Sequence, residues 1–133
     1  MEDGRSRGGV VVTGAARGIG RAIAARFAAA GHPVVGIDLD GDALRAAMAE
    51  LPGGTAVAGD AGDTTVLARA CDLAAGDEGM HAFVANAGTA QAGDSLDYPR
   101  ELWDRLLEVD LTAAFLGART ACPRLRPGGS VTL

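Results

Sequence analysis

Short apolar runs alternate along the chain with longer stretches in which apolar residues recur every three or four positions. The short runs are typical of buried β-strands, and the longer spacing is typical of helices that bury one face. Regular alternation of the two predicts parallel β-α-β units and an α/β fold. The predicted strands lie at about 9–13, 33–38, 55–59, 80–85 and 130–133.

The first two predicted helices each carry one apolar face. After the first strand, Ile19, Ile23 and Phe27 follow one another at four-residue spacing, and Gly31 is a natural C-terminal stop. The second helix is predicted at 40–51. Its apolar stripe consists of Leu44, Ala47, Met48 and Leu51.

The last two predicted helices begin at residues that suit a helix start. Asp63 or Thr64 can cap the third helix, which runs to about Ala75. The fourth, near 100–121, begins by Pro99, and Pro127-Gly128-Gly129 is predicted to separate it from the last strand. Its apolar face consists of Leu102, Leu106, Val109, Ala113 and Leu116.

Length and charge narrow the class of protein. A chain of 133 residues suits one domain, so we expect a single domain over 1–133. A net charge of −5 provides no basic surface for nucleic acid or anionic lipid. The polar opening at 1–7 precedes no apolar signal core, and no apolar stretch reaches the roughly 20 residues that span a bilayer. These features predict a soluble cytoplasmic protein.

Cysteine, histidine and lysine usage further limits the chemistry. Cys71 and Cys122 are far apart in helix-like sequence, and we expect both to be small buried apolar side chains. With only His32 and His81 and no Cys-x-x-Cys pair, no metal site is predicted. All twelve basic residues are arginine, so the chain contains no lysine.

The first strand leads into a glycine-rich turn. Gly14, Gly18 and Gly20 follow it at the spacing Gly-x-x-x-Gly-x-Gly, and a helix begins there. Glycines allow unusual dihedral angles and close backbone approach, and the N–H groups of a helix N-terminus attract anions. The turn therefore predicts a site for the pyrophosphate of a nucleotide, without indicating any reaction.

Asp38 ends the second strand and bears on the choice of nucleotide. A carboxylate there can accept hydrogen bonds from both hydroxyls of an adenosine ribose and repels a 2′-phosphate, which favours NAD. Arg17, within the glycine turn, favours NADP because it can pair with that phosphate. Asp38 is closer to the expected ribose, so NAD is predicted ahead of NADP.

Two further strand ends carry polar residues. Asp60-Ala61 follows the third strand, and Asn86-Ala87-Gly88 follows the fourth. Ligands of a doubly wound sheet lie beyond the carboxyl ends of its strands, so Asp60 can reach an adenine and the Asn86 segment a ribose. Taken singly, each segment is equally an ordinary turn.

Together these segments resemble the short-chain dehydrogenase/reductase family. The matching pieces, in family order, are Thr13–Gly20, Asp38, Asp60, Asn86-Ala87-Gly88 and Val109-Asp110-Leu111-Thr112. The resemblance implies a Rossmann-type doubly wound parallel sheet in the order 3-2-1-4-5, incomplete at the strand-5 edge. It also implies an oxidoreductase that moves hydride between a nicotinamide cofactor and an alcohol or carbonyl substrate. The cofactor contacts that it implies are Gly14, Arg17, Gly18, Ile19, Gly20, Asp38, Asp60, Ala61, Asn86, Ala87 and Gly88.

The chain departs from the family in its catalytic residues. Family members use a serine and a Tyr-x-x-x-Lys pair, in which the lysine lowers the pKa of the tyrosine. Here the only tyrosine, Tyr98, has Leu102 four residues on, and Ser130 precedes the family position. No residue is assigned as catalytic, and the chain alone is predicted to be the inactive N-terminal part of such an enzyme. The alternative is a non-catalytic NAD(H)-binding module or a partner of a complete relative.

Two structural expectations follow from the resemblance. Asp110 stands where the family has asparagine, and both a relay role for its main-chain carbonyl and a plain solvated carboxylate are open. An unprotected fifth strand, and Leu106, Val109, Phe115 and Leu116 without partners, predict marginal stability or self-association through the helix near 100–121.

Overall fold

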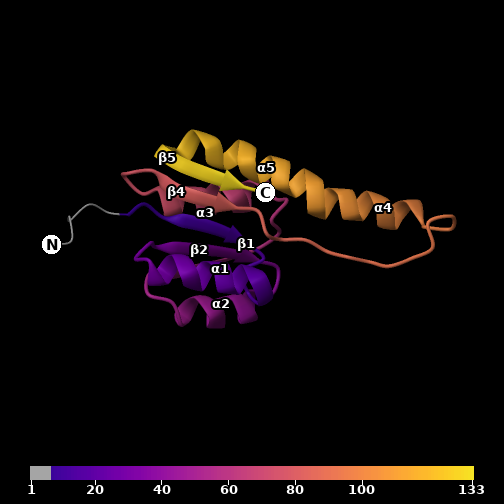
Figure 1. The fold of residues 1–133 in the computed structure, drawn as a ribbon, viewed down its shortest axis with the longest axis horizontal. Coiled ribbons are helices and arrows are strands. Elements are labelled where there is room, and N and C mark those ends of the chain that lie inside the picture. The colour runs from indigo at the N-terminus through magenta and orange to yellow at the C-terminus, as the bar shows by residue number, and fades with distance from the viewer. Residues whose placement is uncertain (1–6) are drawn as a thin grey trace.

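In the computed structural model, which describes residues 7–133, five parallel strands form one sheet in the order β3-β2-β1-β4-β5 (Figure 1). The fold class and the strand order predicted from the sequence are confirmed. The strands are β1 (Val10–Thr13), β2 (Val34–Asp38), β3 (Gly54–Ala58), β4 (Met80–Val84) and β5 (Leu125–Thr132).

Helices follow the first four strands, close to their predicted positions. They are α1 (Gly18–Ala29), α2 (Gly41–Ala49), α3 (Thr64–Ala75), α4 (Arg100–Leu107), the π-helical turn η1 (Glu108–Thr112), α5 (Ala113–Ala121) and the 3-10 turn η2 (Cys122–Arg124). Asp63 caps α3 by accepting from the Thr65 N–H at 2.7 Å. Gly31, at a φ of 87°, follows the end of α1 as expected.

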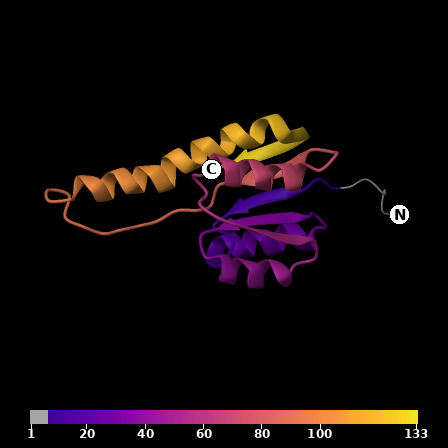
Figure 2. The same ribbon diagram turned by 180° about the vertical axis from the view of Figure 1, so that it is seen from behind.

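The sheet separates two apolar cores, and helices cover both of its faces (Figures 1 and 2). Val10 and Val12 pack toward α1 and α2, whereas Val11 packs toward α3 and α5, because successive strand side chains point to opposite faces. Cys71 lies in the second core, where burial raises the pKa of its thiol to about 11. Cys122 lies in the surface turn η2 and is exposed, so the expectation that it is buried was wrong.

The buried face of α1 differs from the predicted one. It consists of Gly20, Ala24 and Ala28, whereas Ile19 is 74% exposed. Ile23 and Phe27 pack beside the core as partly buried side chains. The start of the helix lies so close to the glycine turn that a Cβ on Gly20 would come 2.1 Å from the Gly14 carbonyl oxygen, so position 20 has room only for glycine.

Strand β5 begins earlier than predicted. It starts at Leu125 and includes Pro127-Gly128-Gly129, which the sequence predicted as a break. The pairing with β4 shifts register between Met80 and Ala82, and Gly128 has a φ of 81°. A bulge and a proline are both tolerated on the edge strand of a sheet, so the ladder continues past these residues.

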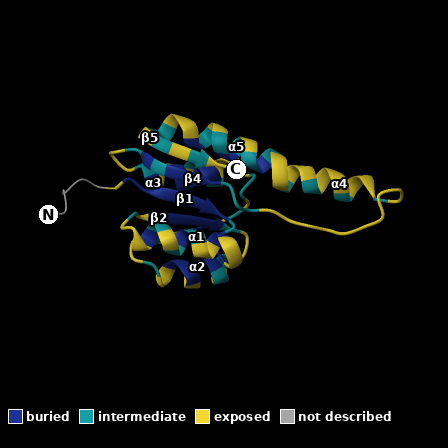
Figure 3. Cartoon of the chain, viewed as in Figure 1, coloured by how far each residue is buried: buried dark blue, intermediate teal, exposed yellow. Residues whose placement is uncertain are grey.

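The long helix from 100 to 121 extends beyond the carboxyl ends of the strands (Figures 1 and 2). Its outer half, α4, has no buried residue and is largely exposed in Figure 3. Leu116 packs against the core, so the expectation that it lacks partners was wrong. Four large apolar side chains are exposed along the helix, Trp103, Leu107, Leu111 and Phe115, and we call them the apolar stripe. Among residues 7–133, no helix is long and apolar enough to cross a bilayer.

Candidate nucleotide-binding site

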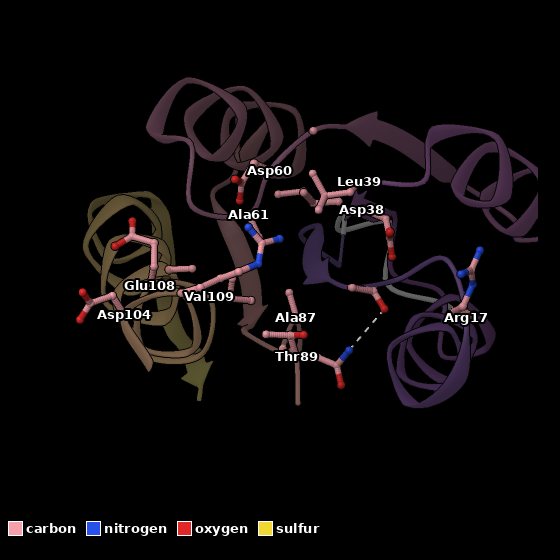
Figure 4. Close-up of a pocket in the computed structure, with 17 residues that line it drawn as sticks. Arg17, Asp38, Leu39, Asp60, Ala61, Ala87, Thr89, Asp104, Glu108 and Val109 are labelled. Carbon is pink, nitrogen blue, oxygen red and sulfur yellow. Dashed lines mark hydrogen bonds between the residues drawn. The ribbon is translucent and has the colours of Figure 1, made fainter. Parts of the chain in front are cut away.

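A cleft of about 720 Å³ lies at the carboxyl ends of the strands (Figure 4). The turns after β1, β2, β3 and β4 form it together with α4 and η1. Eight of the eleven predicted cofactor contacts line this cleft, namely Gly14, Arg17, Asp38, Asp60, Ala61, Asn86, Ala87 and Gly88. The structure thus brings together residues that lie up to 74 positions apart in the sequence, counted from Gly14 to Gly88.

The glycine turn is held by the residues that follow β4. The Asn86 side-chain amide donates to the carbonyl oxygens of Thr13, at 3.1 Å, and Gly14, at 3.3 Å. In return, the Thr13 hydroxyl oxygen accepts from the main-chain N–H groups of Asn86 and Ala87, at 3.0 and 2.9 Å. Gly14 has a φ of 68°, and a Cβ on it would lie 3.0 Å from the Ala87 Cα. This bracing role of Thr13 was not predicted.

The N-terminus of α1 is open to an anion. Its N-cap residue, Arg17, forms no side-chain capping hydrogen bond, and its first turn contains no acidic residue. The N-termini of α2 and α3, by contrast, are capped by Asp40 and Asp63. The uncapped N–H groups of α1 lack intrahelical acceptors and carry the positive end of the helix dipole. The predicted contacts Gly18, Ile19 and Gly20 form this helix start and are not among the residues lining the cleft.

The Asp38 carboxylate is held by two main-chain groups. It accepts from the Ala16 N–H at 3.1 Å through Oδ2 and from the Asp40 N–H at 3.0 Å through Oδ1. The side chain is partly exposed and lines the cleft. This orientation leaves a fixed negative charge at the end of β2, the position at which an adenosine ribose is recognised in this fold.

Arg17 pairs with Asp40, the residue that caps α2. Its Nη2 lies 2.5 Å from Oδ2 of Asp40. Hydrogen bonds from the Ala43 N–H and from Arg17 stabilise the ionised carboxylate of Asp40 and lower its pKa below the ordinary value. The pairing joins the glycine turn to the start of α2.

The far end of the cleft lies between the turn after β3 and the long helix. Asp60 accepts from the Gly62 N–H at 2.7 Å, which fixes the turn that carries Ala61. Leu39, 72% exposed, lies across from Val109 of η1 (Figure 4). Arg105 of α4 also lines the cleft and was not predicted to. Within residues 7–133, the guanidinium of Arg105 has no hydrogen-bond or ion-pair partner.

Asp110 and Tyr98 have structural partners in the segment between β4 and α4. The Asp110 carboxylate accepts from the Thr89 N–H at 2.7 Å, so it anchors the start of that segment to the π-helical turn. The Tyr98 hydroxyl donates to the Gln91 carbonyl oxygen at 3.0 Å. Both side chains hold exposed backbone in place.

The parallel sheet, the glycine turn and the uncapped helix at the cleft define a Rossmann-type nucleotide-binding fold. Residues 14–133 match the family model described as enoyl-(acyl carrier protein) reductase, and the solved structures that resemble the chain include short-chain dehydrogenases/reductases. The chain belongs to the short-chain dehydrogenase/reductase family.

Several relatives extend this comparison. The chain is 43% identical over 126 residues to 1-deoxy-11-beta-hydroxypentalenate dehydrogenase of Streptomyces exfoliatus, covering 90% of this chain and 46% of that protein. It is 34% identical over 121 residues to 2-dehydro-3-deoxy-L-rhamnonate dehydrogenase (NAD(+)) of Sphingomonas sp., covering 90% and 49%. The chain therefore spans about half the length of these relatives.

Two solved structures share the fold over the same part. A short-chain dehydrogenase/reductase described as glucose/ribitol dehydrogenase, from Brucella melitensis, matches with a TM-score of 0.85 and 32% identity, covering 92% of this chain and 54% of that one. A blue fluorescent protein from a metagenomic library, in complex with NADPH, matches with a TM-score of 0.84 and 25% identity, covering 95% and 54%.

Proposed function

We propose that this chain, as one domain over residues 1–133, binds a nicotinamide dinucleotide in the cleft at the carboxyl ends of its strands. The observation that carries the proposal is the uncapped N-terminus of α1 beside Gly14, next to a cleft lined by Asp38 and Asp60. The similar blue fluorescent protein is in complex with NADPH, and a similar dehydrogenase is named for NAD(+).

Each part of the cleft suits one part of the dinucleotide. The N–H groups from Gly18 to Gly20 bind the pyrophosphate, because they are uncapped and point along a helix dipole. Asp38 accepts from the hydroxyls of the adenosine ribose, and Asp60 and Ala61 border the adenine. The backbone of Asn86, Ala87 and Gly88 lies beside the nicotinamide ribose.

NAD is the preferred cofactor in this proposal. The Asp38 carboxylate is fixed where a 2′-phosphate would come and repels it. Arg17, the cation that would favour NADP, is already paired with Asp40. Both features disfavour the phosphorylated cofactor.

For the whole protein we propose hydride transfer between this cofactor and a small-molecule alcohol or carbonyl. The dehydrogenase names of its relatives support that reaction class. The 133-residue chain has no lysine and holds Tyr98 in a loop contact, so it is expected to bind cofactor without turnover. Binding without turnover is also what a non-catalytic NAD(H)-binding module or a partner of a complete relative would show.

The proposal extends to assembly and location. The apolar stripe of the long helix is a surface through which two copies associate, because it presents large apolar side chains on one helix. Both cysteines are free thiols, and Cys122 is exposed, which is usual for a protein of the reducing cytoplasm.

Calorimetric titration of the 133-residue chain with NADH tests the binding proposal. Wild type is expected to bind, and Asp38→Ala is expected to bind NADH at least about tenfold more weakly, because the ribose loses a charged acceptor. Asp42→Ala, which removes an exposed carboxylate outside the cleft, serves as the matched control. A folded wild-type chain that does not bind NADH would overturn the proposal.

A further inference from the structure

We propose that Asp40 is a second cofactor-selecting residue, which disfavours NADPH by holding the guanidinium of Arg17 and keeping it from a 2′-phosphate. The inference rests on the proposed function, because it concerns how the same cleft discriminates between NADH and NADPH. Asp38 excludes the phosphate by its own charge, whereas Asp40 acts by occupying the cation that would otherwise bind the phosphate.

The geometry joins Arg17 to the Asp40 carboxylate, and the Asp40 main chain to the Asp38 carboxylate. Arg17 lines the cleft together with Asp38, and its Nη2 lies 2.5 Å from Oδ2 of Asp40. Asp40 follows Asp38 by two residues, and its N–H donates to Oδ1 of Asp38 at 3.0 Å. Arg17 is thus a lining residue of the same cleft as Asp38, and its guanidinium already has an anionic partner.

Two contacts restrict rotation of the Asp40 side chain away from Arg17. Its Oδ1 accepts from the Ala43 N–H at 3.1 Å and so caps α2, while Oδ2 contacts Arg17. The backbone before it is fixed by the Asp38 contact. The carboxylate is therefore preorganised for Arg17.

An exposed ion pair of this kind contributes little to folding stability. The side chains of Arg17 and Asp40 are 70% and 45% exposed, and such pairs are screened by water and salt. The pair acts on the choice of ligand instead. The 2′-phosphate of NADP must displace Asp40 from Arg17 and then lie beside two carboxylates. NAD has no 2′-phosphate, so its binding does not include this unfavourable free energy.

The variant that isolates this effect is Asp40→Asn. Asparagine caps helices as well as aspartate does, so α2 keeps its cap while the charge is lost. Arg17→Ala and the double variant form a cycle that measures the coupling between the two residues. Asp42→Asn is the matched control, because Asp42 lies in the same first turn of α2 but pairs with Arg45.

Dissociation constants for NADH and NADPH are measured by calorimetry for all five proteins at low and at raised salt. Asp40→Asn is expected to bind NADPH about tenfold more tightly than wild type, with NADH within about twofold, because Arg17 becomes available to the phosphate. The gain is expected to shrink in salt, to be absent with Arg17→Ala and to be absent in Asp42→Asn.

The outcomes separate this inference from the one it rests on. A wild-type chain that binds neither nucleotide overturns the proposed function. A wild-type chain that binds NADH, with no NADPH gain in Asp40→Asn, overturns only the role of Asp40. A gain of equal size in the Arg17→Ala background also overturns it, because simple loss of negative charge would then account for the change.

Discussion

The side-chain amide of Asn86 donates to the main-chain carbonyl oxygen of Thr13, so the segment after β4 braces the start of the glycine turn at the end of β1. Asn86 also donates to the Gly14 carbonyl oxygen, and the Thr13 hydroxyl oxygen accepts from two main-chain N–H groups after β4. The nucleotide cleft thus depends on a hydrogen-bond network between two neighbouring strands.

Removing that brace should cost stability and nucleotide affinity together. Asn86→Ala is expected to lower the free energy of unfolding by about 1–2 kcal/mol, because two partly buried carbonyl oxygens lose their donor. Urea unfolding and NADH titration measure the two effects. Ser95→Ala, in the exposed loop before α4, is the control, and an equal loss there would contradict the assignment.

Two glycines of the turn should respond differently to alanine. In Gly20→Ala the new Cβ would meet the Gly14 carbonyl oxygen, so we expect a loss of about 3 kcal/mol in the free energy of unfolding. Around Gly18 there is open space, so Gly18→Ala should cost only the left-handed backbone, about 1 kcal/mol. Urea unfolding of both variants checks the ranking. The reverse order would contradict the close packing of α1.

Stability should fall as the medium becomes acidic, through His81. Burial lowers the pKa of His81 below its ordinary value of 6.5, and so do the charges of His32 and Arg126. The His32 ring is stacked on that of His81, with 4.2 Å between the ring centroids. The unfolded state therefore binds the proton more readily. The stability contributed by neutral His81 is complete above pH 6.5 and is lost as the pH falls toward the lower, folded pKa.

Urea unfolding of wild type and His81→Gln between pH 7.5 and 5 tests this prediction. The variant should lose less stability than wild type over that interval. His32→Gln should also reduce the loss, because it removes one cause of the shift while leaving His81 to titrate. Parallel pH profiles for wild type and His81→Gln would rule out His81 as the titrating group.

Arg105 should contribute to nucleotide affinity from the long helix. It lines the cleft and has no ion-pair partner among residues 7–133, so its guanidinium is available to the face of an adenine. Arg105→Ala is expected to weaken NADH binding about threefold to tenfold by calorimetry. Arg100→Ala, which breaks a pair with Asp104 on the same helix, is the control and should leave affinity unchanged.

Self-association of the chain should depend on the apolar stripe. Leu111→Asp places a charge in the middle of this stripe and should shift the chain toward monomer in sedimentation velocity, because a buried unpaired charge opposes association. Leu73→Asp alters an exposed leucine on α3 instead and should leave the distribution unchanged. A monodisperse wild-type monomer would contradict the expected association.

The strand-and-helix order and the places of most residues that line the candidate cleft could be predicted because they depend on local patterns. Asp38 and Asp60 follow apolar runs directly, so their place at the edge of a parallel sheet follows from the strands alone. Asp63 caps α3 as its position before the apolar face indicated. The residues adjacent in the sequence were sufficient to predict these strand ends and this helix cap.

Packing decided what periodicity could not. The spacing of Ile19, Ile23 and Phe27 predicted one apolar face, but α1 buries Gly20, Ala24 and Ala28 instead, with Gly20 against the glycine turn. The continuation of β5 through Pro127 likewise depends on its place at the sheet edge, where an irregular ladder is tolerated.

The sequence by itself determined a nucleotide-binding α/β fold, the carboxylates at its strand ends and the absence of lysine. Only the tertiary structure decided which residues touch. Arg17 and Asp40 are 23 positions apart, and Thr13 and Asn86 are 73 apart. Local patterns specify elements, because backbone preferences act over a few residues. Contacts across the cleft arise only when the sheet brings strand ends together, so the pairing of Arg17 with Asp40 emerged from the fold.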